Sequence, residues 1–78
     1  ANIIISVIAY FQNESDIELI SSEYKVTRLS SFKYENYLTV RIDVNTINNE
    51  YMIETKIRDI LLSLMIYHGK YVRISVYY

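Results

Sequence analysis

Apolar and polar positions alternate along two segments of the chain. In residues 37–45 one set points one way (Leu38, Val40, Ile42, Val44) and the other set points the opposite way (Tyr37, Thr39, Arg41, Asp43). Residues 71–78 divide in the same manner (Val72, Ile74, Val76, Tyr78 against Tyr71, Arg73, Ser75, Tyr77). Because side chains on a strand point to alternate faces, both segments are predicted to be strands with one buried face.

Two further segments are predicted to be strands by composition. Residues 2–11 are β-branched and aromatic on both faces, which is typical of a central strand covered on both sides. Residues 24–31 are predicted to be a shorter strand, and residues 31–36 are predicted to be a loop.

A long helix is predicted from about residue 49 to residue 68. Asn48 or Asn49 can cap it, and one helical stripe of apolar residues marks its buried face (Ile53, Ile57, Ile60, Leu61, Leu64). The single glycine, Gly69, is predicted to supply the left-handed residue that ends this helix, with His68 at the negative end of the helix dipole. Further apolar residues in the last two turns predict a contact on a second side of the helix (Leu62, Met65, Ile66, Tyr67).

Residues 15–22 fit two kinds of structure. Ser15 and Glu18 have the spacing of a capping box, which favours a short helix, whereas Ile17 and Leu19 alternate with polar neighbours as in a strand. With the helix, the chain is an α+β protein of β-α-β-β-α-β order, the ferredoxin-like two-layer sandwich. With the strand, the alternative is β-β-β-α-β, one long helix on a four-stranded sheet.

Both arrangements leave one face of the sheet uncovered by helices. The more polar set of the first strand belongs on that face (Ile4, Ser6, Ile8, Tyr10), beside the outward sets of the other strands. A surface that combines aromatic, aliphatic and arginine side chains indicates an interaction site. The predicted interaction face consists of Tyr10, Tyr37, Arg41, Tyr71, Arg73 and Tyr77.

Length and composition predict a single domain, residues 1–78, without disulfides or thiolate metal sites, because cysteine is absent. The longest apolar stretch near the start is shorter than the about 20 residues that cross a bilayer, so no membrane association is expected. A start at Ala1 suits a cytoplasmic chain trimmed of its initiator methionine. Thirteen Ile and nine Tyr against one Gly and no Pro suggest AT-rich codons, which fit an AT-rich cellular genome, a virus or a plasmid. Of these sources we favour a virus or mobile element.

Candidate catalytic chemistry is sparse. The sequence has no cysteine, no glycine-rich phosphate loop and no zinc-protease motif, and its only histidine is His68. Glu14, Asp16 and Glu18 lack the turn glycine and further oxygen ligands of a calcium loop. We therefore expect no enzyme activity, no cofactor and no metal.

Binding to protein is the expected function, with the chain itself as partner in a homodimer. Tyrosine suits interfaces because it buries area while keeping a hydroxyl group for a partner. Two copies packed face to face through the uncovered sheet face would bury its aromatic and aliphatic side chains (Ile4, Ile8, Tyr10, Tyr37, Tyr71, Tyr77). The strand at 71–78, which has no proline and one charge, offers a second route through edge pairing. The alternative is single-stranded nucleic acid on the Tyr and Arg face, in a topology that resembles RNA-recognition domains. A formal charge of −1 and a pI near 5.7 argue against this alternative.

Overall fold

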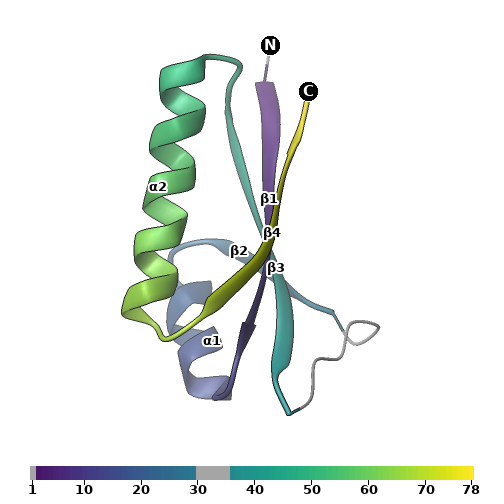
Figure 1. Ribbon diagram of the computed structural model, residues 1–78, viewed down its shortest axis with the longest axis vertical. Helices are drawn as coiled ribbons and strands as arrows, with labels where there is room; N and C mark the ends of the chain where they lie inside the picture. The colour runs from purple at the N-terminus through teal and green to yellow at the C-terminus, as the bar shows by residue number, and fades with distance from the viewer. Residues whose placement is uncertain (1, 30–35) are drawn as a thin grey trace.

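Four strands and two helices form an α+β protein, seen in Figure 1. The computed structural model describes residues 2–29 and 36–78. Along the chain the elements are β1 (Asn2–Phe11), α1 (Glu14–Ser21), β2 (Lys25–Arg28), β3 (Leu38–Ile47), α2 (Glu50–Ile66) and β4 (Lys70–Tyr77). Most of the predicted loop at 31–36, and the end of the predicted strand at 24–31, lie outside the described residues.

The strands make one antiparallel sheet in the order β2-β3-β1-β4, with β1 and β3 at its centre. The β1–β3 register sets Ile5 opposite Val44 and Val7 opposite Ile42, which brings the apolar sets of both strands to one face. Directly opposed residues lie on the same side of a sheet. The predicted alternation of residues 37–45 is therefore confirmed, as is the outward set of β1.

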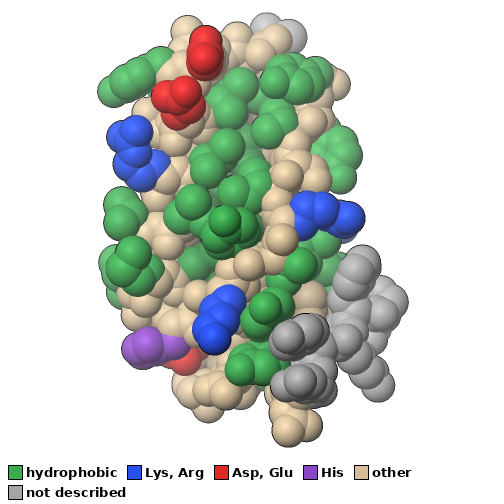
Figure 2. Space-filling view, viewed as in Figure 1, with side chains coloured by type: hydrophobic (Ala, Val, Ile, Leu, Met, Phe, Trp, Pro, Cys, Tyr) green, Lys and Arg blue, Asp and Glu red, His purple; other side chains and the backbone are tan. Residues whose placement is uncertain are grey.

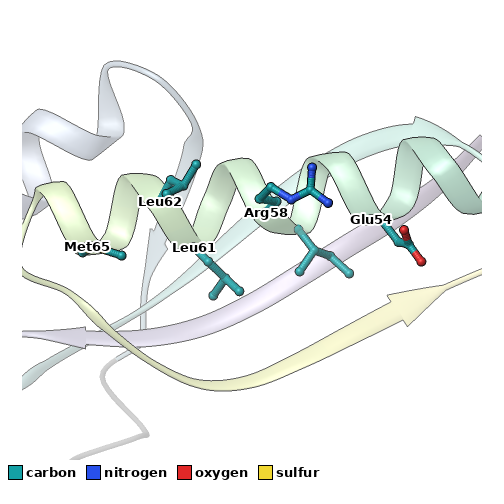
Figure 3. Close-up of a pocket in the computed structure, with 6 residues that line it drawn as sticks. Glu54, Arg58, Leu61, Leu62 and Met65 are labelled. Carbon is teal, nitrogen blue, oxygen red and sulfur yellow. The ribbon is translucent and has the colours of Figure 1, made fainter.

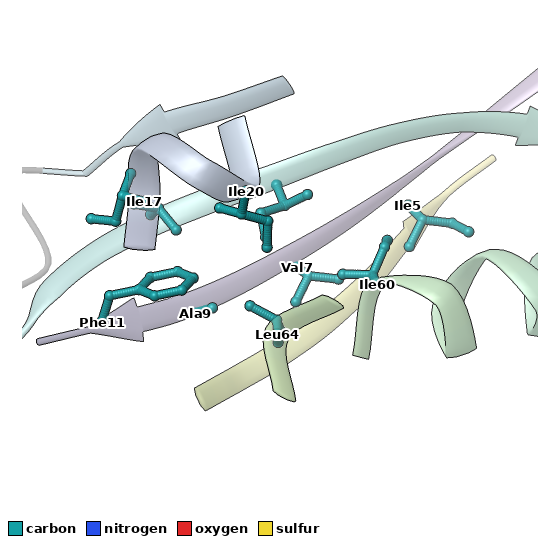
Figure 4. Packing of buried hydrophobic residues seen from close by; sticks show 10 residues of the cluster. Ile5, Val7, Ala9, Phe11, Ile17, Ile20, Ile60 and Leu64 are labelled. Carbon is teal, nitrogen blue, oxygen red and sulfur yellow. The ribbon is translucent and has the colours of Figure 1, made fainter. Parts of the chain in front are cut away.

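Both helices cover the same face of the sheet. Inward residues of β1 pack against Ile17 and Ile20 of α1 at one end and against Ile60 and Leu64 of α2 along the rest, as Figure 4 shows. Phe11, fully buried, lies at the end of β1 in this cluster. Neither of the described helices lies on the opposite face of the sheet (Figure 1).

Residues 14–21 are the helix α1, which decides between the two structures that the sequence allowed for this segment. Its N-cap is Asn13, whose side chain makes no capping hydrogen bond, so the predicted capping box that begins at Ser15 is wrong. Ile17 and Ile20 are both fully buried, and this burial fixes the helix against the sheet. Glu14 forms an ion pair with Arg28 of β2.

The start of α2 confirms one of the two predicted caps. The Asn49 side chain accepts a hydrogen bond from the Met52 amide at 3.1 Å. This bond satisfies one of the amide groups that the first turn of a helix leaves without a partner.

The end of α2 corrects the prediction for Gly69. The left-handed residue is His68, with φ of 62°, and no glycine has positive φ among the described residues. The Gly69 amide donates to the Leu64 carbonyl at 2.8 Å, and the His68 amide donates to the Met65 carbonyl at 3.4 Å. These two bonds are those of a Schellman motif with histidine at the position that glycine usually occupies.

Three polar contacts join the end of α2 to α1 and the turn that follows it. The Tyr67 hydroxyl donates to Glu23, and this hydrogen bond, with burial and the Glu23 charge, raises the pKa of the Tyr67 phenol above 10.0. His68 Nδ1 lies 3.6 Å from a carboxylate oxygen of Asp16. Ser63 Oγ lies 3.5 Å from the Tyr24 hydroxyl. The two helices are thus held together beside the buried cluster.

Candidate functional site

The sheet face away from the helices, here called the open face, combines the outward residues of all four strands. Register places them in rows across the sheet. One row runs Arg73, Ile8, Arg41, Thr27 and the next runs Ser75, Ser6, Asp43, Lys25. Of the predicted interaction face, Tyr10, Arg41, Arg73 and Tyr77 lie on this side of the sheet by register.

Charged groups on the open face are mostly basic. The Arg41 Nε–H donates to Asp43 at 3.0 Å, which fixes the guanidinium over the sheet. Lys25 lies opposite Asp43 on the other side, so this carboxylate stands between two cations. A shallow hollow of about 370 Å³ spans the four strands here, lined by Ile4, Ser6, Lys25, Arg41, Asp43, Asn45 and Tyr77.

Two predicted tyrosines meet at one end of the open face. The rings of Tyr10 and Tyr37 have centroids 5.1 Å apart and are tilted by 56°, a favourable aromatic arrangement. The Gln12 side-chain amide lies 3.5 Å from the Tyr37 hydroxyl. This pair lies along β1 and β3, away from Tyr77 at the other end of the same face.

Tyr71 is not where the alternation predicted it. Ile8 lies opposite Arg73, but the next residue of β1, Ala9, lies opposite Tyr71, so Val72 is an extra residue in a β-bulge. The bulge moves Tyr71 to the helix side of the sheet and Lys70, opposite Tyr10, to the open face. Alternation in the sequence does not place Lys70 on this face, because a bulge leaves no mark in an alternating pattern.

A second surface lies along the outer edge of β4, and we call it the β4 edge surface. It consists of residues 71–77 with the adjacent side of α2, where a groove of about 410 Å³ is lined by Glu54, Ile57, Arg58, Leu61, Leu62 and Met65. Figure 3 shows Leu61 pointing from α2 toward the sheet while Leu62 points away from it. Figure 2 shows hydrophobic side chains in a nearly continuous band on this side of the molecule.

Most of the apolar residues predicted to make a contact on a second side of α2 are exposed in the described structure. Tyr67 is half-buried against Glu23, but Leu62, Met65 and Ile66 are 49%, 72% and 66% exposed. Seven of the twelve exposed large hydrophobic residues belong to the second half of α2, to β4 or to the residue after it. Their broad apolar pattern was the signal in the sequence for this surface.

The described residues offer little for metal binding. No group of three or more His, Cys, Asp or Glu side chains gathers within residues 2–29 and 36–78. Neither described helix has the length and hydropathy needed to cross a bilayer. His68, the single histidine, lies beyond the last turn of α2, where its ring is exposed and near Asp16.

Comparison with known proteins gives no relative from which a function can be carried over. No protein-family model, no curated protein and no solved structure matches this chain.

Proposed function

We propose that the chain is a self-associating module and that two copies pair through the β4 edge surface as a homodimer. The observation that carries this proposal is the coincidence of an unpaired strand edge with the main cluster of exposed apolar side chains. In the described sheet β4 pairs on one side only, with β1. An edge strand of eight residues without proline is a template for another strand.

The bulge at Val72 limits which part of β4 can pair. Residues 73–77 are regular, and the antiparallel register that pairs this whole segment with its copy is centred on Ser75. Arg73 of each copy then lies opposite Tyr77 of the other on the open side. A guanidinium beside a tyrosine ring is favourable, and like charges do not face one another.

The same symmetry brings the two α2 helices together on the other side of the joined sheet. Met65 and the groove beside Leu61 then become buried between them. A stable interface covers about 800 Å² on each partner, which is about one-seventh of this chain's 5344 Å² of accessible surface. A strand of eight residues together with one side of a 17-residue helix is of suitable size.

Pairing of two open faces is the less favourable route to a dimer. It would set Arg41, Arg73 and Lys25 of one copy against the same cations of the other, with Asp43 as the only carboxylate of the described residues on that face. Like charges brought together in an interface oppose association.

Sedimentation equilibrium at micromolar concentration tests the proposal. Wild type is expected at about twice the chain mass of 9.3 kDa. Met65→Glu and Tyr77→Glu, both at exposed positions, are expected to give monomers because each places a charge in the buried interface. Leu19→Glu, at a residue 52% exposed on α1, is the matched control and should stay dimeric.

Tyr37→Glu separates the two routes to a dimer. Tyr37 lies next to β3, which β1 separates from β4 in the sheet, so this variant should remain a dimer if the β4 edge pairs. A wild type that is monomeric at high concentration, or a dimer that only Tyr37→Glu disrupts, would contradict the β4 edge interface.

We also propose a fold class and a biological setting for the chain. We assign the chain to the ferredoxin-like class, which its β-α-β-β-α-β element order supports. We further propose a regulatory or accessory role in the cytoplasm for a virus or mobile element, which the Ile- and Tyr-rich composition supports. Metagenomic sequences that place this gene in a cellular operon would overturn the viral setting.

A further inference from the structure

We infer that the open face binds the phosphate backbone of single-stranded nucleic acid. This inference does not rest on the dimer, because two of the four cations that carry it, Lys25 of β2 and Arg41 of β3, lie away from β4. It starts from a separation of charge between the two layers that the net charge of −1 conceals.

The open face is basic and the helical layer is acidic. Four cations project from the open face (Lys25, Arg41, Lys70, Arg73) beside one carboxylate, Asp43, which gives this face a charge of +3 among the described residues. On the other side, α1 and the turn after it carry four carboxylates and α2 carries three. Three cations accompany them (Arg28, Lys56, Arg58), which leaves −4.

The basic groups of the open face are arranged to meet a chain of anions. Arg73 and Arg41 lie in one row on either side of Ile8, two strand spacings or about 10 Å apart. Lys25 lies in the next row. Among the described residues no carboxylate forms an ion pair with Lys25, Lys70 or Arg73. Asp43 accepts a hydrogen bond from the Nε–H of Arg41, and the Arg41 side chain is 43% exposed.

Apolar side chains between these cations favour a single strand over a duplex. Ile4 and Tyr77, both exposed, line the hollow beside Arg41 and give bases an apolar surface to cover. A duplex keeps the faces of its bases stacked inside, whereas a single strand presents unstacked base faces together with its phosphates. An acidic protein segment would match the positive charge of the open face but would cover Ile4 and Tyr77 less completely than bases do.

Fluorescence anisotropy with labelled 15-nucleotide dT and rU probes tests the inference. With a net of three cations engaged, the salt slope for a single strand is about −2, so affinity should fall roughly 20-fold between 50 and 200 mM salt. Lys25→Gln with Arg41→Gln should weaken binding at 50 mM salt at least about tenfold and flatten this slope. The dimer mass should stay unchanged, since neither residue belongs to β4.

The matched control is Lys56→Gln with Arg58→Gln, which removes the same two charges from α2. It should leave binding nearly unchanged. If the Arg41 variant fails to fold, Lys25→Gln with Lys70→Gln, both exposed, replaces it with the same expectation for binding and for its salt dependence. Absence of binding at 50 mM salt, equal loss in the control, tighter binding to duplex, or equal binding to polyglutamate would each overturn the inference.

Discussion

Gly69 lies against the ring of Phe11. A methyl group placed on the Gly69 Cα would come within 2.6 Å of both Cε2 and Cζ of Phe11, and within 2.8 Å of a methyl carbon of Leu64. Phe11 and Leu64 are buried, so neither can easily move aside. The single glycine of the chain is therefore needed for close packing where α2 passes into β4, and not for a left-handed turn.

Gly69→Ala should destabilise the protein by about 1–3 kcal/mol, the usual cost of forcing extra volume into a packed core. The free energy of unfolding, measured with urea at fixed protein concentration, tests this. Gly69→Ala combined with Phe11→Leu should recover part of the loss, because leucine has no ring at the contact. A stability equal to wild type in Gly69→Ala would contradict the close contact.

His68→Gly should stabilise the protein by about 1 kcal/mol. His68 holds φ of 62°, which costs an L-residue energy that glycine avoids. The gain is reduced by loss of the contact with Asp16. Thermal unfolding of His68→Gly and His68→Ala separates the two effects, because alanine loses the contact without relieving the backbone. A lower melting temperature for glycine than for alanine would show that the backbone is relaxed at this residue.

Asn49→Ala should lower stability by about 1 kcal/mol, since it removes the acceptor for the Met52 amide. Asn48→Ala is the matched control, because Asn48 is the neighbouring asparagine and lies before the cap. Chemical denaturation of both variants tests which residue caps α2. Equal losses in the two variants would refute the assignment to Asn49.

Thr46→Val should raise stability by about 1–2 kcal/mol. The Thr46 hydroxyl is buried on the helix side of β3, opposite Ile3, and finds no hydrogen-bond partner among the described residues. Thr55→Val is the contrasting control, because the Thr55 hydroxyl donates to the Tyr51 carbonyl at 2.8 Å and its removal should bring no gain. A loss of stability in Thr46→Val would indicate that the hydroxyl is satisfied.

Strand parity could be predicted from the sequence because alternation has only two phases and burial selects one of them. In β3 the choice between the Ile42 set and the Arg41 set leaves no ambiguity, and the structure agrees. The prediction that Tyr71 lies on the open face was wrong, because the bulge at Val72 adds a residue without changing the local composition. Only the register against β1 reveals the shift.

The positive charge of the open face could not be predicted from the composition. Net charge adds Arg41 on the open face to Glu54 on α2, although the sheet separates the two groups. The prediction that Gly69 is the left-handed residue at the end of α2 was wrong for a related reason. Glycine is the usual left-handed residue, but the packing of Phe11 against Gly69 became visible only when distant segments were placed together.

The melting temperature should rise with protein concentration if the β4 edge pairs. When a dimer unfolds to two separate chains, its free energy of unfolding rises by about 1.4 kcal/mol for each tenfold increase in concentration, or about 0.7 kcal/mol per chain. For a domain of this size the gain corresponds to roughly 3–5 °C.

Calorimetry of wild type, Met65→Glu and Leu19→Glu between 5 and 500 μM measures this dependence. Met65 is 72% exposed in the single chain, so its substitution should leave the fold intact while it removes the concentration dependence. Leu19→Glu should keep the dependence, since α1 lies away from the β4 edge. The edge interface requires that folding and association are coupled. A wild-type melting temperature that does not change with concentration would contradict it.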